Sequence, residues 1–347
     1  MRKLVTTDGI EFHWSEYQLS SLDPLGVRVE VEFAAPKHGT ESHVFGGSVQ
    51  QRKRWDPELR LFLPRAEDAP APAPQERAVG NMVVGTVSQV GSQVTRYAAG
   101  DKVFGYGPIC EAHQMPETHW RPLGNLSPQD AVSADPGHVA FVAMRDGNVR
   151  IGDQVAVFGL GAIGLMAVQI ALAAGAEHVT AVDPIALRRD CAKRLGAQQV
   201  LDPRAGDAAL AIKRATNNKG VDVAIETSGN SAALNEAIRC IRQCGTVVHV
   251  PWGPKDASQL HLDEEFHLNR PTIIGSQAWA GWGNPDRDYP LWDPERAYQA
   301  VVSLLSRGVI SGQPIIDPLV DFEDAPMLFN TLFTNPAQAI KIGVSRQ

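Results

Sequence analysis

The sequence has little cysteine and no long apolar run. Its four cysteines are Cys110, Cys191, Cys240 and Cys244. They are too few and too widely spaced for a disulfide framework, so we expect small buried residues rather than disulfides or metal ligands. No apolar stretch approaches the about 20 residues that cross a bilayer, and no apolar segment follows Arg2 and Lys3 as in a signal peptide. We therefore expect a cytoplasmic protein with no membrane partner.

The sequence also lacks an excess of basic residues. With 32 Lys and Arg against 39 Asp and Glu, the formal net charge is −7, and no basic run is interleaved with aromatic residues. Nucleic acids and anionic membranes attract basic surfaces, so neither is an expected partner. The 44% hydrophobic content is that of a folded globular protein, and 347 residues exceed one ordinary core and predict two domains.

The most informative stretch of the sequence is residues 154–183. Residues 155–158 predict a short strand, and residues 159–164 read Gly-Leu-Gly-Ala-Ile-Gly. The apolar, alanine-rich segment 165–174 predicts a buried helix, and residues 178–182 predict a second strand. Asp183 follows, nineteen residues after the last glycine of the motif. Strand, glycine motif, helix, strand and acid in this order predict a dinucleotide-binding unit.

Each position of the glycine motif has a physical reason. Gly159 permits the tight turn, Gly161 lets the backbone approach a pyrophosphate without a Cβ in the way, and Gly164 allows close packing of the helix on the sheet. The N–H groups at the start of the helix, at Ala162 and Ile163, face the phosphates together with the positive end of the helix dipole. These five residues are therefore predicted to bind the cofactor.

Asp183 decides between the two nicotinamide cofactors. Its carboxylate can accept hydrogen bonds from the adenosine ribose hydroxyls, and its charge would repel a 2′-phosphate. NAD is therefore expected rather than NADP. Arg188 and Arg189 follow closely and could partly reverse this preference, so Arg188 is counted among the predicted cofactor-binding residues.

The rest of the sequence predicts two kinds of domain. Residues 143–277 alternate strands with helices, which predicts an α/β fold with a doubly wound parallel sheet of the Rossmann type. Residues 1–142 are rich in strand patterns, such as the alternating run 27–33, and are predicted to form a β-rich domain. They include a Pro/Ala-rich stretch at 64–77 that predicts a surface excursion. Residues 278–347 are expected to return to this first domain.

Several motifs make the whole chain resemble the medium-chain dehydrogenase/reductase superfamily, in particular its polyol dehydrogenase branch. Residues 91–103, GSQVTRYAAGDKV, and residues 151–164, IGDQVAVFGLGAIG, are similar to segments of that family. Gly196-Ala197 with Asp202, and Glu226-Thr227-Ser228-Gly229, match positions that line the cofactor there, and the resemblance implies a cofactor-binding role for Asp202 and Thr227 here. It also implies that the β-rich domain is GroES-like and that the protein is a homodimer or homotetramer.

The chain departs from this family at the positions of the zinc ligands. Where the family's catalytic-zinc loop begins with cysteine, this sequence reads His-Gly-Thr-Glu-Ser-His over residues 38–43. The family's Gly-His-Glu motif is replaced by Gly80-Asn81-Met82, and the glutamate before proline of the polyol branch is Asp135. The cysteine quartet of the structural zinc is missing. Because asparagine is a poor zinc ligand, we expect no bound zinc.

Without zinc, oxidation of an alcohol needs a base for the hydroxyl proton. His38 would stand where the family has its metal-binding sulfur, so its imidazole is predicted to be the general base. Thr40 and His43 match the family's proton relay, and the resemblance implies that role for them. Lys37 is a weaker candidate that could lower the pKa of His38 or hold an oxyanion, and Asp135 could orient His38. The alternative is that both histidines are solvated loop residues.

We therefore predict an NAD-dependent, zinc-independent dehydrogenase that oxidises a secondary hydroxyl of a polyol, sugar or cyclitol by hydride transfer to nicotinamide C4. The alternatives are a zinc-free reductase of activated C=C bonds or quinones, an epimerase that retains NAD, and a non-catalytic dinucleotide-binding protein. The aromatic loop 279–292 could line the site of a sugar-like substrate or pack in a subunit interface.

Overall fold

The computed structural model describes residues 1–37, 39, 41, 53–64, 75–253, 256–278, 291–333 and 335–346. The chain divides into two compact units, Met1–Val132 with Ile316–Gln347, and Ser133–Ile315. The sequence analysis placed the boundaries near residues 142 and 277. In the structure the second unit also includes the helices α4 (Ala134–Asp146) and α10 (Pro294–Ser306), because α4 packs against the first helix that follows the glycine motif and α10 packs against α4.

The second unit is built on a six-stranded parallel sheet with the strand order β13-β12-β11-β14-β15-β16. Its strands are β11 (Gln154–Phe158), β12 (His178–Val182), β13 (Gln199–Leu201), β14 (Val221–Glu226), β15 (Ile241–His249) and β16 (Thr272–Gly275). The order reverses between β11 and β14, which is the doubly wound Rossmann topology, so the predicted fold class is confirmed. Ligands of such sheets bind outside the carboxyl ends of the strands at this switch point.

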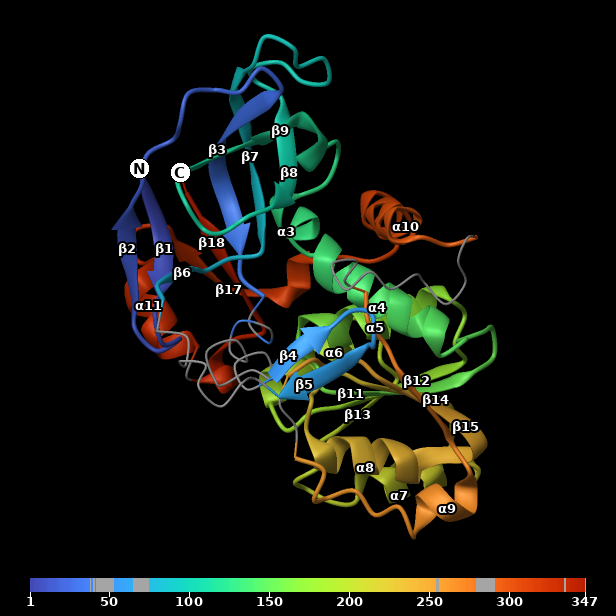
Figure 1. Ribbon diagram of the computed structural model, residues 1–347. Coiled ribbons are helices and arrows are strands. Elements are labelled where there is room, and N and C mark those ends of the chain that lie inside the picture. The colour runs from blue at the N-terminus through green and yellow to red at the C-terminus, as the bar shows by residue number, and fades with distance from the viewer. Residues whose placement is uncertain are drawn as a thin grey trace. The chain divides into compact units, whose positions relative to one another are not determined.

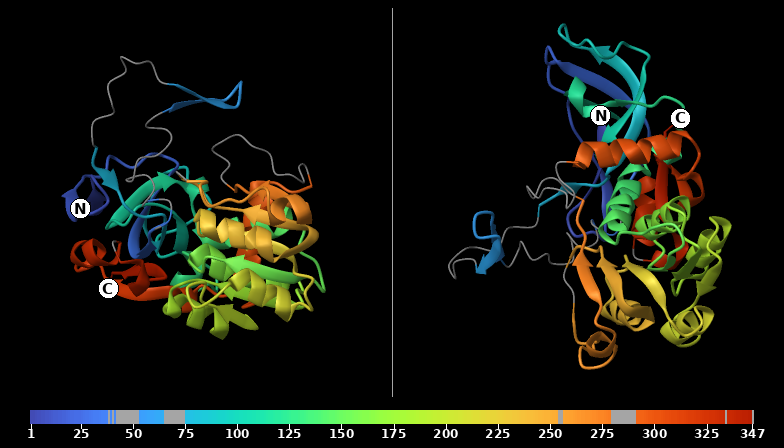
Figure 2. Two further views of the ribbon diagram at one scale, coloured as in Figure 1. Left: turned by 90° about the horizontal axis from the view of Figure 1, so that it is seen from below. Right: turned by 90° about the vertical axis from the view of Figure 1, so that its right-hand side faces the viewer.

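Helices cover both faces of this sheet (Figure 1), and Figure 2 shows the same layers from two other directions. Besides α4 they are α5 (Ala162–Ala173), α6 (Ala186–Arg194), α7 (Ala208–Ala215), α8 (Ser231–Cys240) and α9 (Glu265–Asn269). Helix α10 packs on α4, and the 3-10 turn η3 (Gln313–Ile315) ends the unit. Helices α7, α8 and α9 lie on one face, and α4, α5 and α6 lie on the other. Phe158, Ile212 and Ile238 belong to the hydrophobic core between the sheet and the first of these layers. None of the described helices is long and apolar enough to cross a membrane.

The cysteine prediction is wrong at one position. Cys110, Cys191 and Cys240 are buried, but Cys244 is exposed. The β14–β15 ladder pairs Val221 with Ile241 and then Val223 with Thr246, so residues 242–245 bulge out of it. Cys244 sits in this bulge with φ 56, which takes its side chain away from the core.

The first unit is β-rich. Its largest sheet has the order β10-β8-β7-β3-β18-β17 with β9 paired to β3, a second sheet has the order β2-β1-β6, and β4 pairs with β5. The elements are β1 (Arg2–Thr6), β2 (Phe12–Glu16), β3 (Gly26–Ala35), β4 (Lys53–Asp56), β5 (Leu61–Pro64), β6 (Arg77–Ala78), β7 (Met82–Val90), β8 (Lys102–Tyr106), β9 (Ala112–Pro116), η1 (Glu117–His119), β10 (Arg121–Pro122), α3 (Pro128–Ala131), β17 (Ile316–Asp321), α11 (Ala325–Leu332), η4 (Pro336–Gln338) and β18 (Lys341–Ser345). Fully buried Trp120 and Phe329 belong to its core.

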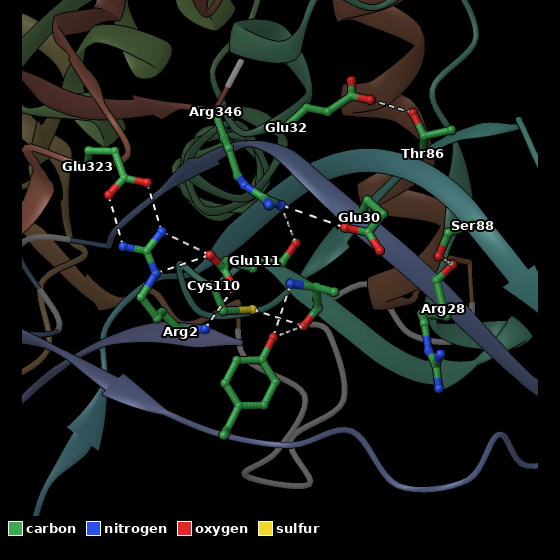
Figure 3. A network of polar contacts seen from close by, with 12 residues as sticks. Arg2, Arg28, Glu30, Glu32, Thr86, Ser88, Cys110, Glu111, Glu323 and Arg346 are labelled. Atoms are coloured by element: carbon green, nitrogen blue, oxygen red, sulfur yellow. Dashed lines mark hydrogen bonds and ion pairs between the residues drawn. The ribbon is translucent and has the colours of Figure 1, made fainter.

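A network of polar contacts joins the two ends of the chain within the first unit (Figure 3). Arg2 forms ion pairs with Glu111 at 3.0 Å and with Glu323 at 2.7 Å. Arg346 Nη1 donates to the backbone oxygen of Glu111 at 2.9 Å and lies 3.7 Å from a carboxylate oxygen of Glu30. Together with the pairing of β18 to β3, these contacts fold the last segment of the chain onto the first.

Candidate functional site

The glycine motif forms the connection between β11 and α5. Gly159 has φ 84, a left-handed conformation that favours glycine, and a Cβ there would lie 2.6 Å from a backbone nitrogen of the loop after β14. A Cβ on Gly164 would lie 1.8 Å from the Gly159 oxygen, so a larger residue does not fit. A Cβ on Gly161 would meet nothing within 4 Å, and no side chain caps α5. An anion can therefore approach the first N–H groups of α5, those of Ala162 and Ile163.

Asp183 directly follows β12 and is 3% exposed. Its Oδ2 accepts the Leu160 N–H at 2.7 Å, and its Oδ1 accepts the Ile185 N–H at 2.7 Å. The carboxylate therefore fixes the glycine turn to the end of β12. Each carboxylate oxygen keeps a second lone pair, which can accept a hydrogen bond from a ribose hydroxyl.

The arginines near Asp183 are engaged with acids. Arg188 Nη1 lies 3.9 Å from Asp183 Oδ2, and burial lowers the pKa of the Arg188 guanidinium. Arg189 Nη1 donates to the Asp183 carbonyl oxygen at 2.7 Å and lies 3.1 Å from Asp202 Oδ2. Asp202 also accepts from Arg204, and these hydrogen bonds lower the pKa of Asp202. The predicted residues Arg188 and Asp202 thus belong to one charge cluster around the end of β12.

Thr227 follows β14 and reaches the glycine turn. Its Oγ1 donates to the Gly159 oxygen at 2.6 Å, and its backbone N–H donates to the Phe158 oxygen at 2.8 Å. The structure thus places all the predicted cofactor-binding residues at the carboxyl edge of one sheet, which is where a Rossmann fold binds its ligand. Their binding of a dinucleotide stays a prediction.

Two further residues lie at this edge: Glu226, which the resemblance placed among the cofactor-lining positions, and His249, for which the sequence predicted no role. Glu226 ends β14 and is 0% exposed, His249 ends β15, and its Nδ1 lies 2.9 Å from Glu226 Oε2. The strand register pairs the two residues directly. A recognisable signal for His249 was present, because an ionisable residue follows the apolar run Ala224-Ile225 at the end of β14 and the apolar run Val247-Val248 at the end of β15.

The predicted catalytic loop belongs to the first unit, and the structure describes it only in part. His38, Thr40 and His43 lie outside the described residues, so their roles as base and relay stay predictions. Lys37 is described, and its carbonyl oxygen accepts the Glu41 N–H at 3.0 Å.

Glu41 is a half-buried acid in this loop for which the sequence predicted no role. Its Oε1 accepts the Gly80 N–H at 2.7 Å, and its Oε2 is buried with no hydrogen-bond partner in the described ranges. Burial raises the pKa of Glu41 to about 6, although the Gly80 N–H and Lys341 act in the opposite direction. Lys341 is 4% exposed and donates to the Pro36 oxygen at 2.7 Å. The backbone on each side of His38 is therefore held against the rest of the unit.

Asn81 stands next to Gly80, where the resembling family has a metal-binding histidine. Its backbone N–H donates to the Ala35 oxygen at 3.0 Å, and its carbonyl oxygen accepts the Gly107 N–H at 3.0 Å. Its side-chain Nδ2 is buried and has no hydrogen-bond partner among the residues that the structure describes. Burial of an unsatisfied amide costs free energy, and such groups are found where a protein binds a ligand.

Asp135 belongs to the second unit. It lies in the first turn of α4 and is 5% exposed, and His138, on the same helix, is 7% exposed. The His138 ring packs edge-on against Tyr298 with 5.6 Å between ring centroids. The predicted contact of Asp135 with His38 involves a residue outside the described ranges and stays a prediction.

Within the described ranges, no three His, Cys, Asp or Glu side chains form a group that could hold a metal ion. His38 and His43 were outside that search, so the predicted absence of zinc stays a prediction.

Residues 279–290 of the aromatic loop also lie outside the described residues, whereas Trp292 is described. Arg145 and Arg296 lie over its ring, 3.9 and 4.1 Å from the centroid, and the Phe141 ring centroid is 5.5 Å away. Trp292 therefore packs between α4 and α10 of its own unit.

Comparison with known proteins gives a consistent result. A family model described as zinc-binding dehydrogenase matches residues 162–288. The chain is 39% identical to D-guloside 3-dehydrogenase of Escherichia coli (strain K12), over 99% of this chain and 100% of the relative. It is 39% identical to sorbitol dehydrogenase of Bacillus subtilis (strain 168), over 55% of this chain and 50% of the relative. Its fold matches the crystal structure of 2R,3R-butanediol dehydrogenase from Bacillus subtilis, with a TM-score of 0.76 at 23% identity over 100% of this chain and 99% of that one.

Proposed function

The chain belongs to the zinc-binding dehydrogenase family of the medium-chain superfamily, and we propose that it oxidises a secondary hydroxyl of a sugar, polyol or cyclitol with NAD. It is an oxidoreductase that acts on CH–OH donors. The observation that carries the proposal is the similarity, over the full length and at 39% identity, to an enzyme named D-guloside 3-dehydrogenase. A relative named for a sugar derivative favours a sugar hydroxyl as the reacting group.

The geometry around Asp183 supports NAD rather than NADP. Family members use one or the other, and the choice depends on the residues that meet the adenosine ribose. Here Arg188 approaches Asp183, and Arg189 is engaged by Asp202. A 2′-phosphate would therefore meet a buried carboxylate whose neighbouring cations already have acidic partners. Ribose hydroxyls would instead donate to that carboxylate.

The residues at the family's metal positions do not fit a zinc ion. They are His38, Asn81 and Asp135, one imidazole, one amide and one carboxylate. A catalytic zinc takes three protein ligands from thiolate, imidazole and carboxylate groups, and an amide is not among them. Asn81 instead places a buried N–H donor at its position. We therefore propose a reaction in which no zinc ion carries the negative charge of the substrate oxygen.

Bound NAD would supply the hydride acceptor at nicotinamide C4. The chain then has to remove the hydroxyl proton, and His38 is the proposed base, with Thr40 and His43 as its relay. An imidazole suits this task because its ordinary pKa is about 6.5. Lys37 is the proposed cation beside the substrate oxygen. Hydrogen bonds hold the Pro36 carbonyl oxygen and the Glu41 side chain in place. These contacts support a loop that can position the proposed groups.

The test is elemental mass spectrometry of the purified protein, combined with NAD⁺ reduction across a panel of glycosides, polyols and cyclitols with and without chelator. We expect a metal-free protein whose turnover is insensitive to chelator. His38→Ala should abolish turnover and keep NADH affinity, and His267→Ala, which changes an exposed histidine of α9, should change neither. Stoichiometric zinc with chelator-sensitive turnover would contradict the proposed base.

We also propose that the protein is a homodimer or homotetramer, as the family resemblance implies, and that it is located in the cytoplasm. Light scattering coupled to size-exclusion chromatography measures the subunit count directly.

A further inference from the structure

Two buried polar atoms of the first unit, both near the predicted catalytic loop, lack a hydrogen-bond partner. They are Glu41 Oε2, an acceptor, and Asn81 Nδ2, a donor, and no described residue bonds to either of them. The two atoms therefore do not bond to each other, although Glu41 Oε1 accepts the N–H of Gly80, the residue before Asn81. One donor and one acceptor are thus left unsatisfied on neighbouring side chains.

The backbone of Asn81 is held on both sides. Its N–H donates to the Ala35 oxygen at 3.0 Å, and its carbonyl oxygen accepts the Gly107 N–H at 3.0 Å. Gly80 has φ 135, and a Cβ there would lie 2.4 Å from the Ile109 nitrogen, so the backbone before Asn81 packs directly on another loop. Because the main chain is fixed by these contacts, a partner for Nδ2 has to come to it.

The Glu41 carboxylate is held in a similar way. Its Oε1 accepts the Gly80 N–H at 2.7 Å, and the Glu41 N–H donates to the Lys37 oxygen at 3.0 Å, the bond of one helical turn. Burial raises the pKa of Glu41 to about 6, so at pH 7.5 the carboxylate is ionised and Oε2 can only accept hydrogen bonds. A buried carboxylate oxygen without a donor costs free energy, which a donor on a ligand would offset.

A hydroxyl group matches this pair of atoms, because it both donates and accepts hydrogen bonds. One hydroxyl can donate to Glu41 Oε2 and accept from Asn81 Nδ2. A carbonyl oxygen only accepts and an ammonium group only donates, so neither can satisfy both atoms. Lys37, the proposed cation beside the reacting oxygen, lies one helical turn before Glu41. The hydroxyl that binds here is therefore a second hydroxyl of the substrate.

We propose that Asn81 and Glu41 bind a second hydroxyl of the substrate, carried by a carbon next to the one that is oxidised. The substrate class is then a vicinal diol, as in a sugar or a cyclitol, rather than a monohydric alcohol. This inference rests on the proposed function and deepens it. It also gives a role to an amide that stands where the resembling family has a metal ligand.

The test measures kcat/KM for NAD⁺ reduction with the member of the glycoside, polyol and cyclitol panel that gives the highest value. It is repeated with the two analogues that carry hydrogen in place of one hydroxyl next to the oxidised carbon. Asn81→Leu should lower kcat/KM about tenfold, and Glu41→Gln at least as much, because charge-assisted hydrogen bonds are stronger. NADH affinity should be unchanged. Asn125→Leu and Glu264→Gln, at exposed positions, are the matched controls and should behave as the wild type does.

The analogues separate a contact with the substrate from a structural role. With the analogue that lacks the bound hydroxyl, the wild type and both variants should give the same kcat/KM. A loss of equal size for the full substrate and for both analogues would show a structural role and overturn the proposal. Glu41→Gln keeps the acceptor for the Gly80 N–H and the size of the side chain, so it decides the matter if Asn81→Leu does not fold.

The same measurements distinguish this inference from the proposed function. If the wild type oxidises no member of the panel, the proposed function itself fails. If the wild type is active and both variants match it on the full substrate, only this inference fails, and an ordered water molecule is the partner of the two atoms.

Discussion

The polar groups at the carboxyl edge of the parallel sheet and those in the loop around Glu41 differ in their hydrogen-bond partners. At the sheet edge, both oxygens of Asp183 accept backbone N–H groups, and three donors converge on one oxygen of Glu226. In the loop, Glu41 Oε2 and the nearby Asn81 Nδ2 are buried and have no partner in the described part of the chain. In the first region, therefore, backbone donors hold Asp183 and one oxygen of Glu226, although Glu226 Oε2 and His249 Nδ1 have no hydrogen-bond partner among the described residues. In the second region, the unsatisfied atoms lie next to the predicted catalytic loop.

This difference has a physical consequence. A satisfied carboxylate rigidifies the backbone that it binds, so the sheet edge is formed before any ligand arrives. An unsatisfied buried group costs free energy in the folded protein and is retained where it serves a ligand. We therefore expect substitutions that disturb the packing or the hydrogen bonds of the sheet edge to damage both folding and cofactor affinity. Substitutions of the unsatisfied groups in the loop region should improve stability while they impair turnover.

Gly164→Ala should have the largest effect at the sheet edge. Its Cβ would lie 1.8 Å from the Gly159 oxygen, so the turn must shift. We expect a loss of about 3 kcal/mol in the free energy of unfolding and no measurable NADH binding. Urea denaturation and fluorescence titration measure the two effects.

Gly161→Ala is the matched control, because its Cβ would meet nothing within 4 Å. It should retain the stability of the wild type and lose NADH affinity, since the methyl group enters the space left for the pyrophosphate. Equal stability of the two variants would contradict the close packing at Gly164.

Asp183→Asn should have the next largest effect. The amide has one acceptor oxygen in place of two, so it cannot replace both hydrogen bonds from the Leu160 and Ile185 N–H groups. The substitution also removes the negative charge that would repel a 2′-phosphate. We expect NADH affinity to fall about 10- to 100-fold, the cost of charge-assisted hydrogen bonds, while NADPH affinity falls less. Titration of both cofactors gives the ratio, and an unchanged ratio would remove Asp183 from the discrimination.

Glu41→Gln should change the pH dependence of stability in the loop region. The pKa of Glu41 is raised from 4.5 to about 6, so the unfolded chain releases this proton at a lower pH than the folded protein does. Stability is therefore lost as the pH rises from about 4.5 to above 6, and the loss reaches about 2 kcal/mol. The variant should gain stability over the wild type by this amount between pH 4.5 and 7.5.

Urea denaturation across this pH range measures the difference. Glu264→Gln, at an exposed position, is the control and should give a flat difference. A flat difference for Glu41→Gln as well would show that its carboxylate is not enclosed.

Asn81→Leu should have the smallest effect. Replacing an unsatisfied buried amide with an apolar group of similar size should leave stability unchanged or raise it by about 1 kcal/mol. Asn235→Leu is the control, because Asn235 is buried and accepts the His261 N–H at 3.2 Å, and it should lose stability. Chemical denaturation distinguishes the two. A destabilised Asn81→Leu variant would mean that its amide is already satisfied in the folded protein.

The sheet edge could be predicted closely because its determinants are local. Gly159, Gly164 and Asp183 belong to one strand-helix-strand segment, so their spacing alone places them together. His249 was missed because β14 and β15, and with them Glu226 and His249, become neighbours through the sheet register, which the spacing of residues along the chain does not reveal. Their shared place at strand ends was the available signal.

What the sequence determined by itself is the doubly wound fold, the family resemblance and the glycine turn, because hydrophobic periodicity and glycine conformations act over a few residues. Tertiary structure alone decided the environment of Glu41, which depends on Gly80 and Lys341 from distant parts of the chain. It also decided that His249 Nδ1 lies 2.9 Å from the carboxylate of Glu226 on the neighbouring strand. Burial and charge pairing are properties of the packed molecule, and no local pattern encodes them.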